Sequence, residues 1–228
     1  FNQRLARPPC MGLFIWNLAM DITDQELSHQ ETTLTENQGR VLLLACGALA
    51  REILDIIDRH GFSHLDLKCL PAILHNTPET ITPLIEQKIA EHRACYENIY
   101  VLYADCGTGG LLKAACNRLN VEMLRGPHCY SFFEGNEDFA KRDECTAFYL
   151  TDFLVRPFDA FLWIPLGLDR HPDLISIYFG NYTKLVYQAQ NPTTDLIEKA
   201  RGYANKMGLE FEYRPTGYGD LEAELVSF

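Results

Sequence analysis

The sequence lacks a hydrophobic run long enough to cross a membrane. The longest apolar stretch near its start, Met11 to Met20, is only half of the roughly 20 residues that a spanning helix needs. An acidic, polar segment, Asp21 to Glu36, follows this stretch without a small-residue cleavage site, so we do not expect a signal peptide. These features predict a cytoplasmic protein without a membrane partner.

Runs of basic residues are also missing, and the net charge is −11. A nucleic-acid-binding surface needs clustered lysine and arginine, so the charge excludes nucleic acid as an expected partner. The sequence has no low-complexity tract or heptad repeat, and 47% of its residues are hydrophobic. This composition is typical of a globular chain, and 228 residues allow one large α/β domain or two small ones.

No C-x-x-C pair occurs, although the sequence has eight cysteines. Zinc ribbons and thioredoxin-type motifs need that spacing and are therefore excluded. A disulfide framework is not expected in a cytoplasmic chain of this size. Five cysteines lie in unremarkable contexts and are interpreted as small core or surface residues: Cys10, Cys69, Cys95, Cys116 and Cys145.

Apolar runs that alternate with amphipathic segments predict the secondary structure. The predicted strands are 40–47, 65–70, 99–104, 121–124, 160–164, 184–189 and 209–214, and the predicted helical segments are 48–60, 77–96, 111–120, 130–158, 173–182, 194–207 and 219–226. This alternation is typical of an α/β fold with a mainly parallel, Rossmann-like sheet and helices on both faces. We expect a single, pseudo-two-lobed α/β domain over residues 40–228.

Residues 1–39 differ in composition from the rest and are predicted to be an N-terminal extension. Phe14, Ile15 and Trp16 form an apolar group that packs either on the body of the chain or on a second copy. A subunit contact through this group predicts a homo-oligomer.

Three cysteines stand at the predicted ends of strands: Cys46, Cys106 and Cys129. Ligands of open α/β sheets bind at the carboxyl ends of strands, so these thiols are expected to converge. Gly47 and Gly107 directly follow two of them, and Gly126 lies shortly before Cys129, so the bare backbone allows a ligand to approach closely. Three thiolates hold an iron–sulfur cluster, the preferred prediction, or zinc with His128 as a fourth ligand. The alternative is that they are small residues in tight turns.

A second hypothesis, in which the site holds no metal, is based on the loop that follows Cys106. The amides of Gly107, Thr108, Gly109 and Gly110 would form an anion-binding cradle at a helix start and activate Cys106 as a nucleophile. The loop lacks the Lys-Ser/Thr of a P-loop, and Asp105 beside it opposes a bound anion.

Further polar residues are candidates for the same edge. His75 lies in a loop before a helix, where it either joins the site or is a helix-capping or core histidine. Asp169, Arg170 and His171 follow the strand predicted at 160–164 and could act as acid, base and anion clamp. The alternative for these three is a solvated turn at a helix start.

The motifs resemble those of the uncharacterised bacterial and archaeal domain-of-unknown-function family 1638. The resemblance covers Val41 to Leu225 through ACGALARE, LPAILHN, YADCGTGG, GPHCYSFF, FYLTDF, GLDRHP, YFGNY and TGYGDLE, in this order. It implies a prokaryotic cytoplasmic protein in which Cys46, Cys106 and Cys129 belong to shared motifs. It also associates the chain with corrinoid-dependent methyl transfer, and hence with a corrinoid protein or methyltransferase as partner.

The leading hypothesis is therefore an enzyme, or an enzyme accessory, with a metal–thiolate centre that acts on a small-molecule substrate. A metal centre with an open coordination position suits methyl or sulfur transfer. Two alternatives stay open: a metal-free transferase with Cys106 as nucleophile, and a non-catalytic binding or scaffold subunit.

Overall fold

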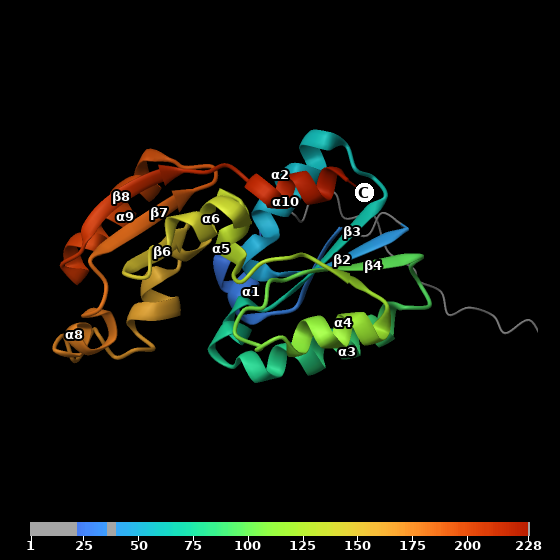
Figure 1. Cartoon of the computed structure of the whole chain (residues 1–228), viewed down its shortest axis with the longest axis horizontal. Coiled ribbons are helices and arrows are strands. Elements are labelled where there is room, and N and C mark those ends of the chain that lie inside the picture. The colour runs from blue at the N-terminus through green and yellow to red at the C-terminus, as the bar shows by residue number, and fades with distance from the viewer. Residues whose placement is uncertain (1–21, 36–39, 228) are drawn as a thin grey trace, which may run out of the picture.

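A computed structural model of the chain describes residues 22–35 and 40–227, which form a mixed α/β fold with two largely parallel sheets (Figure 1). The first sheet has the strand order β1-β3-β2-β4-β5 and the second has the order β6-β7-β8. The strands are β1 (Thr32–Thr35), β2 (Val41–Cys46), β3 (Leu65–Leu70), β4 (Asn98–Leu102), β5 (Glu122–Met123), β6 (Ala147–Thr151), β7 (Lys184–Ala189) and β8 (Glu210–Pro215).

Helices connect most of these strands. They are α1 (Asp24–His29), α2 (Ala50–His60), α3 (Ile81–His92), α4 (Leu111–Leu119), α5 (Cys129–Glu134), α6 (Asn136–Arg142), α7 (Asp152–Val155), α8 (Leu174–Phe179), α9 (Thr194–Met207) and α10 (Gly219–Val226). Short 3-10 turns are η1 (Gly47–Leu49), η2 (Ala72–Asn76) and η3 (Pro78–Thr80), and a π-helical turn is η4 (Asp159–Trp163).

The first sheet is covered on both faces, as predicted for its parallel strands. Leu42, Leu43 and Leu44 of β2 are all fully buried, because a parallel strand between two helical layers needs apolar side chains on both sides. Figure 1 shows α2 and α10 over one face, with α3 and α4 over the other.

The edge of the first sheet makes it mixed rather than purely parallel. Strand β1 pairs with β3 in the antiparallel direction. Leu27 of α1 and Leu34 of β1 are buried in the core of this sheet, so residues 22–35 of the expected extension contribute to the sheet itself. The predicted contact through Phe14, Ile15 and Trp16 lies outside the described residues.

The second sheet corrects two predictions. The segment 130–158 is not helical throughout, because it contains β6, whose aromatic residues Phe148 and Tyr149 suit a strand. The predicted strand at 160–164 is wrong, because Asp159–Trp163 forms η4. A short apolar run fits a strand or a helix equally well. Here Trp163 is buried in the hydrophobic core beside the second sheet, together with Val155, Leu185 and Ala200.

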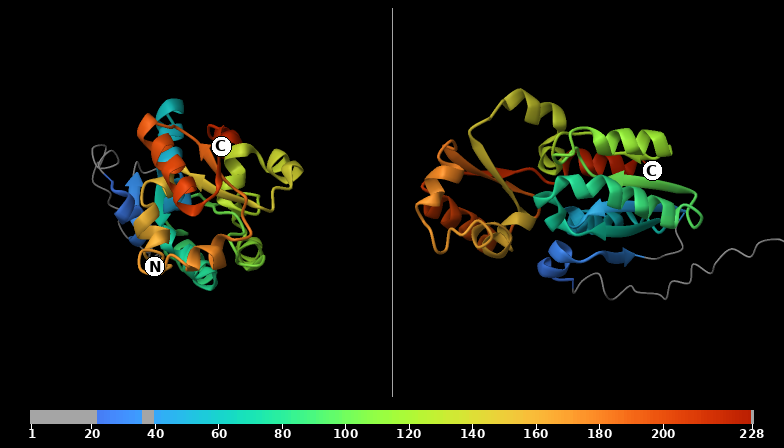
Figure 2. Two further views of the ribbon diagram at one scale, coloured as in Figure 1. Left: turned by 90° about the vertical axis from the view of Figure 1, so that its left-hand side faces the viewer. Right: turned by 90° about the horizontal axis from the view of Figure 1, so that it is seen from below.

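The carboxyl ends of β2 and β6 face each other. Turn η1, which follows β2, packs against α7, which follows β6. The chain then returns from the second sheet to the first through α10, which contacts α2 and α5 (Figures 1 and 2). The edge where the cysteines were predicted to meet therefore lies toward the second sheet.

Candidate metal–thiolate site

The first sheet has its topological switch point between β2 and β4. From β2 the chain moves to β3 on one side and later to β4 on the other side. Such a reversal of strand order leaves a gap outside the carboxyl ends of the two central strands, where open α/β sheets bind ligands. Cys46 ends β2, and Cys106 lies four residues after β4.

Two backbone hydrogen bonds bring Cys106 and Cys129 together. The amide of Asp105 donates to the carbonyl of Gly126 at 3.1 Å, and that of Cys106 donates to Pro127 at 3.3 Å. These bonds fasten the loop after β4 to the loop before α5. As a result the Sγ atoms of Cys106 and Cys129 lie 3.2 Å apart.

His75 completes a group of three ligand side chains. Among the described residues, the ligand atoms of His75, Cys106 and Cys129 all lie within 4.8 Å of one another. Nδ1 of His75 is 2.9 Å from the carbonyl oxygen of Ala72. Because a carbonyl only accepts hydrogen bonds, Nδ1 carries a proton, and in the neutral ring Nε2 is then the nitrogen with a free lone pair. This is the tautomer that a metal-binding histidine needs.

Cys46 lies next to this group without belonging to it. Its Sγ is 3.9 Å from Nδ1 of His75 and accepts a hydrogen bond from the amide of Ala48 at 3.3 Å. Of the three thiols predicted to converge, Cys106 and Cys129 form a close pair, and Cys46 contacts the imidazole of His75.

The thiols create surroundings that favour positive charge. Burial alone would lower the pKa of His75, but Cys46 and Cys106 raise it well above its usual value. The pKa of Cys106 is itself raised, first by its contact with Cys129 and then by burial. Two sulfurs this close, one buried and one partly buried, share negative charge poorly unless a cation lies between them.

Tyr103 is a neighbour of the group that the sequence did not reveal. It is fully buried, and its ring stacks on His75 with 6.3 Å between centroids. Burial raises its pKa, and Cys46 and Cys129 add to the shift. Within the described chain its hydroxyl finds no hydrogen-bond partner. The only signal was its place at a predicted strand end, directly before the Ala-Asp-Cys motif.

The glycine loop after Cys106 binds a carboxylate of its own chain. Asp105 accepts hydrogen bonds from the amides of Gly109 and Gly110, at 3.2 and 2.6 Å, and from the hydroxyl of Thr108 at 3.0 Å. Burial would raise the pKa of Asp105, but these bonds lower it. Gly107, at the start of this loop, has a positive φ, which glycine adopts easily. The loop thereby supports the turn that carries Cys106.

The other predicted residues do not belong to this group of ligand atoms. His128 is exposed, and its ring stacks on Tyr130 with 4.9 Å between centroids. The premise for Asp169, Arg170 and His171 is wrong, since the segment predicted to be the strand before them, 160–164, lies in η4 and the residue after it. All three are exposed, and Arg170 faces Asp169 at 3.8 Å.

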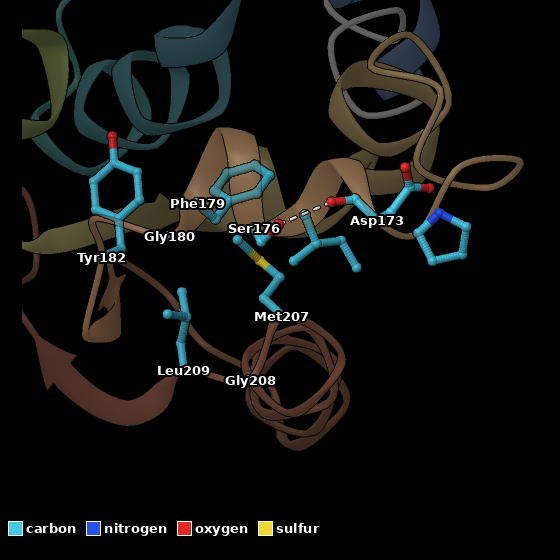
Figure 3. Close-up of a pocket in the computed structure, with 10 residues that line it drawn as sticks. Asp173, Ser176, Phe179, Gly180, Tyr182, Met207, Gly208 and Leu209 are labelled. Carbon is cyan, nitrogen blue, oxygen red and sulfur yellow. Dashed lines mark hydrogen bonds between the residues drawn. The ribbon is translucent and has the colours of Figure 1, made fainter.

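Two open cavities border α8 near the second sheet. One of about 640 Å³ includes Asp169, Trp163 and Lys206 in its lining. The other, of about 410 Å³, lies between α8 and the end of α9, where Phe179, Met207 and Leu209 face it (Figure 3). The hydrogen bond drawn there joins the hydroxyl of Ser176 to the carbonyl of Asp173 within the chain. Neither lining includes a cysteine or a histidine.

The fold and the site define an α/β protein with two sheets and a candidate metal–thiolate centre. The chain belongs to the family described as "protein of unknown function (DUF1638)", whose model matches residues 69–225. This range includes His75, Cys106 and Cys129, whereas Cys46 precedes it. No curated protein and no solved structure matches the chain. In the part of the chain that the structure describes, no helix has both the length and the apolar character needed to cross a membrane.

Proposed function

We propose that His75, Cys106 and Cys129 hold a single metal ion of the zinc type and that the protein is a metal-dependent transferase. The observation that carries this proposal is the group of three ligand atoms within 4.8 Å. Two thiolates and one imidazole are a usual ligand set for zinc.

The distance between the two sulfurs favours one ion over the iron–sulfur cluster preferred from the sequence. Zinc–sulfur bonds of about 2.3 Å place two thiolates on a tetrahedral ion about 3.8 Å apart. The sulfurs of Cys106 and Cys129, at 3.2 Å, need to separate only slightly to reach that geometry. In a [4Fe–4S] cluster each thiolate binds a different iron, which requires a wider spacing.

Three protein ligands leave one coordination position open, as in catalytic zinc sites. A bound zinc ion would hold a substrate thiol as its thiolate there, which is the chemistry that methyl or sulfur transfer needs. The chain itself contributes the buried surroundings, the proton on Nδ1 of His75 and the hydroxyl of Tyr103. A small-molecule thiol is accordingly the proposed substrate class.

Several wider expectations remain part of the proposal. The order β3-β2-β4-β5 supports a Rossmann-like classification of the first sheet. A corrinoid protein or methyltransferase as partner rests on the family resemblance alone. A homo-oligomer and a cytoplasmic location rest on the sequence.

Metal stoichiometry tests the proposal. The full chain should bind one zinc ion per molecule, and His75→Ala, Cys106→Ser and Cys129→Ser should each lower the affinity at least tenfold, because a hydroxyl is a poor zinc donor. Cys116→Ser is the matched control, since Cys116 is a buried thiol of α4 outside the group. Equal zinc binding by all four variants would contradict the proposal.

The metal-free nucleophile is the second candidate, favoured by the place of His75 beside Cys106 in the group of three ligand side chains. It predicts a chain that binds no zinc and whose Cys106 is alkylated rapidly at neutral pH. A scaffold subunit predicts neither property.

A further inference from the structure

Cys106 and Cys129 are held as a pair by backbone contacts and not by the chance meeting of two side chains. The hydrogen bonds from Asp105 to Gly126 and from Cys106 to Pro127 fix the two loops against each other. The resulting separation of 3.2 Å between the sulfurs exceeds a disulfide bond, about 2.05 Å, by little more than 1 Å. Side-chain rotation can close a gap of this size without moving the backbone far.

We propose that Cys106 and Cys129 form a reversible disulfide when the protein meets a peroxide. The pair then acts as a redox-sensitive modification site, in addition to any role as metal ligands. The formation of the disulfide needs only the two thiols and the oxidant, so it does not depend on the proposed function.

The unequal exposure of the two sulfurs sets the order of the reaction. Cys129 is partly exposed, whereas Cys106 is 8% exposed, so a peroxide reaches Cys129 first. The thiolate of Cys129 attacks one oxygen of hydrogen peroxide, the O–O bond breaks, and a sulfenic acid and hydroxide form. The sulfur of Cys106 then attacks the sulfur of Cys129, the S–O bond breaks, and water leaves. The two thiols lose two electrons and two protons, and one peroxide becomes two water molecules.

Cys46 is a poorer partner for Cys129 than Cys106 is. Its sulfur is fully buried and is held by the amide of Ala48 and the ring of His75. The structure therefore assigns the resolving role to Cys106.

The disulfide would also control the metal, a consequence that rests on the proposed function. Its formation removes two of three ligands at once, so zinc should leave the site. Conversely, bound zinc should protect the pair, because coordinated sulfur lone pairs are less available to the oxidant.

The experiment treats the full-length chain, freed of metal by a chelator, with equimolar hydrogen peroxide and maps its peptides without reduction. We expect a linked pair of peptides that contain Cys106 and Cys129, and recovery of both thiols with dithiothreitol. In Cys106→Ser, Cys129 should stop at sulfenic acid, which dimedone traps. Cys145→Ser is the matched control, because it removes an exposed thiol elsewhere and should leave the linkage intact.

Oxidation of Cys129 to sulfinic acid without linkage, or its linkage to another cysteine, would overturn the inference. Zinc binding without this disulfide would refute the inference and leave the proposed function standing. A disulfide in a chain that never binds zinc would refute the proposed function and leave the inference standing.

Discussion

Glu52 is a single carboxyl whose burial should make stability depend on pH. It lies on α2, is 4% exposed, and has one oxygen without a hydrogen-bond partner in the described chain. Burial raises its pKa to about 7 from an ordinary value of 4.5, although the charge of Arg156 acts in the opposite direction. The folded chain therefore keeps a proton on Glu52 over a range in which the unfolded chain has already released it.

The substitution Glu52→Gln tests this effect. Because the folded pKa is the higher one, the contribution of Glu52 is fully present below pH 4.5 and is lost as the pH rises toward 7. The variant has no carboxyl to ionise, so relative to the native chain it should gain about 3 kcal/mol in unfolding free energy between these limits. Urea denaturation of both chains at several pH values measures the difference. A constant difference across the range would show that Glu52 does not titrate in this way.

The contact of Tyr103 with the candidate site could not be predicted from the sequence. Tyr103 is part of an apolar run, and nothing in that run distinguishes a core tyrosine from one that stacks on a ligand histidine. Its contact with His75 depends on where η2 places the imidazole after β3. That placement is a property of the sheet and not of the local sequence.

At the scale of elements, α1 depends on the glycine that follows Cys46. A Cβ atom at Gly47 would lie 2.2 Å from the carbonyl oxygen of Leu27 and 3.2 Å from that of Leu70. Only glycine allows α1 to approach η1 this closely.

Gly47→Ala should therefore destabilise the fold, by roughly 1–3 kcal/mol, because either α1 or η1 must move. Gly202→Ala is the matched control, since Gly202 lies in α9 with no atom within 4 Å of an added Cβ. It should raise stability by about 0.5–1 kcal/mol through helix propensity. Thermal unfolding of both variants distinguishes them; similar melting temperatures would argue against the close packing of α1.

Much of the element pattern could be predicted from the sequence. Strands β3 and β7 and helices α9 and α10 have the predicted bounds, because a continuous apolar run or a helical period with clear ends identifies them. Helix α1 was missed although Thr23 and Glu26 form a capping box, a recognisable helix start. Strand β6 was missed because its aromatic residues fit a helix face equally well. The separate second sheet could not be predicted, since pairing between strands is not encoded locally.

The edge of the sheet at which the candidate site lies could be predicted from the sequence. The set of side chains that meet there could not. The common place of Cys106 and Cys129 after strands indicated that they would meet. The choice of His75 over His128 could not be made from the sequence, because it depends on turn η2 in one case and on stacking against Tyr130 in the other.

At the scale of the whole molecule, a network of charges joins α5 to the second sheet. Arg214 of β8 donates to Glu134 of α5 at 2.8 Å and to Glu144, before β6, at 3.0 Å. The side chains of Arg214 and Glu134 are 10% and 5% exposed. Lys184 of β7 bonds to the same Glu144 at 2.6 Å. Since α5 begins with Cys129, this network also anchors one wall of the site.

Arg214→Met should be destabilising, by about 3 kcal/mol, because it removes the cation between two largely buried carboxylates, whose remaining ion pairs are those of Glu134 with Arg142 and of Glu144 with Lys184. Arg118→Met is the control; Arg118 pairs with Glu86 on the surface and is 64% exposed, so its loss should cost less than about 1 kcal/mol. Chemical denaturation of the two variants provides the comparison. Equal effects would mean that the network does not hold α5 to the second sheet.

X-ray absorption at the zinc edge of the zinc-loaded chain identifies the atoms that bind the metal. We expect two sulfur ligands at about 2.3 Å, one imidazole nitrogen at about 2.0 Å and one further oxygen from solvent. A first shell with three or four sulfurs, or with none, would contradict a centre built on His75, Cys106 and Cys129.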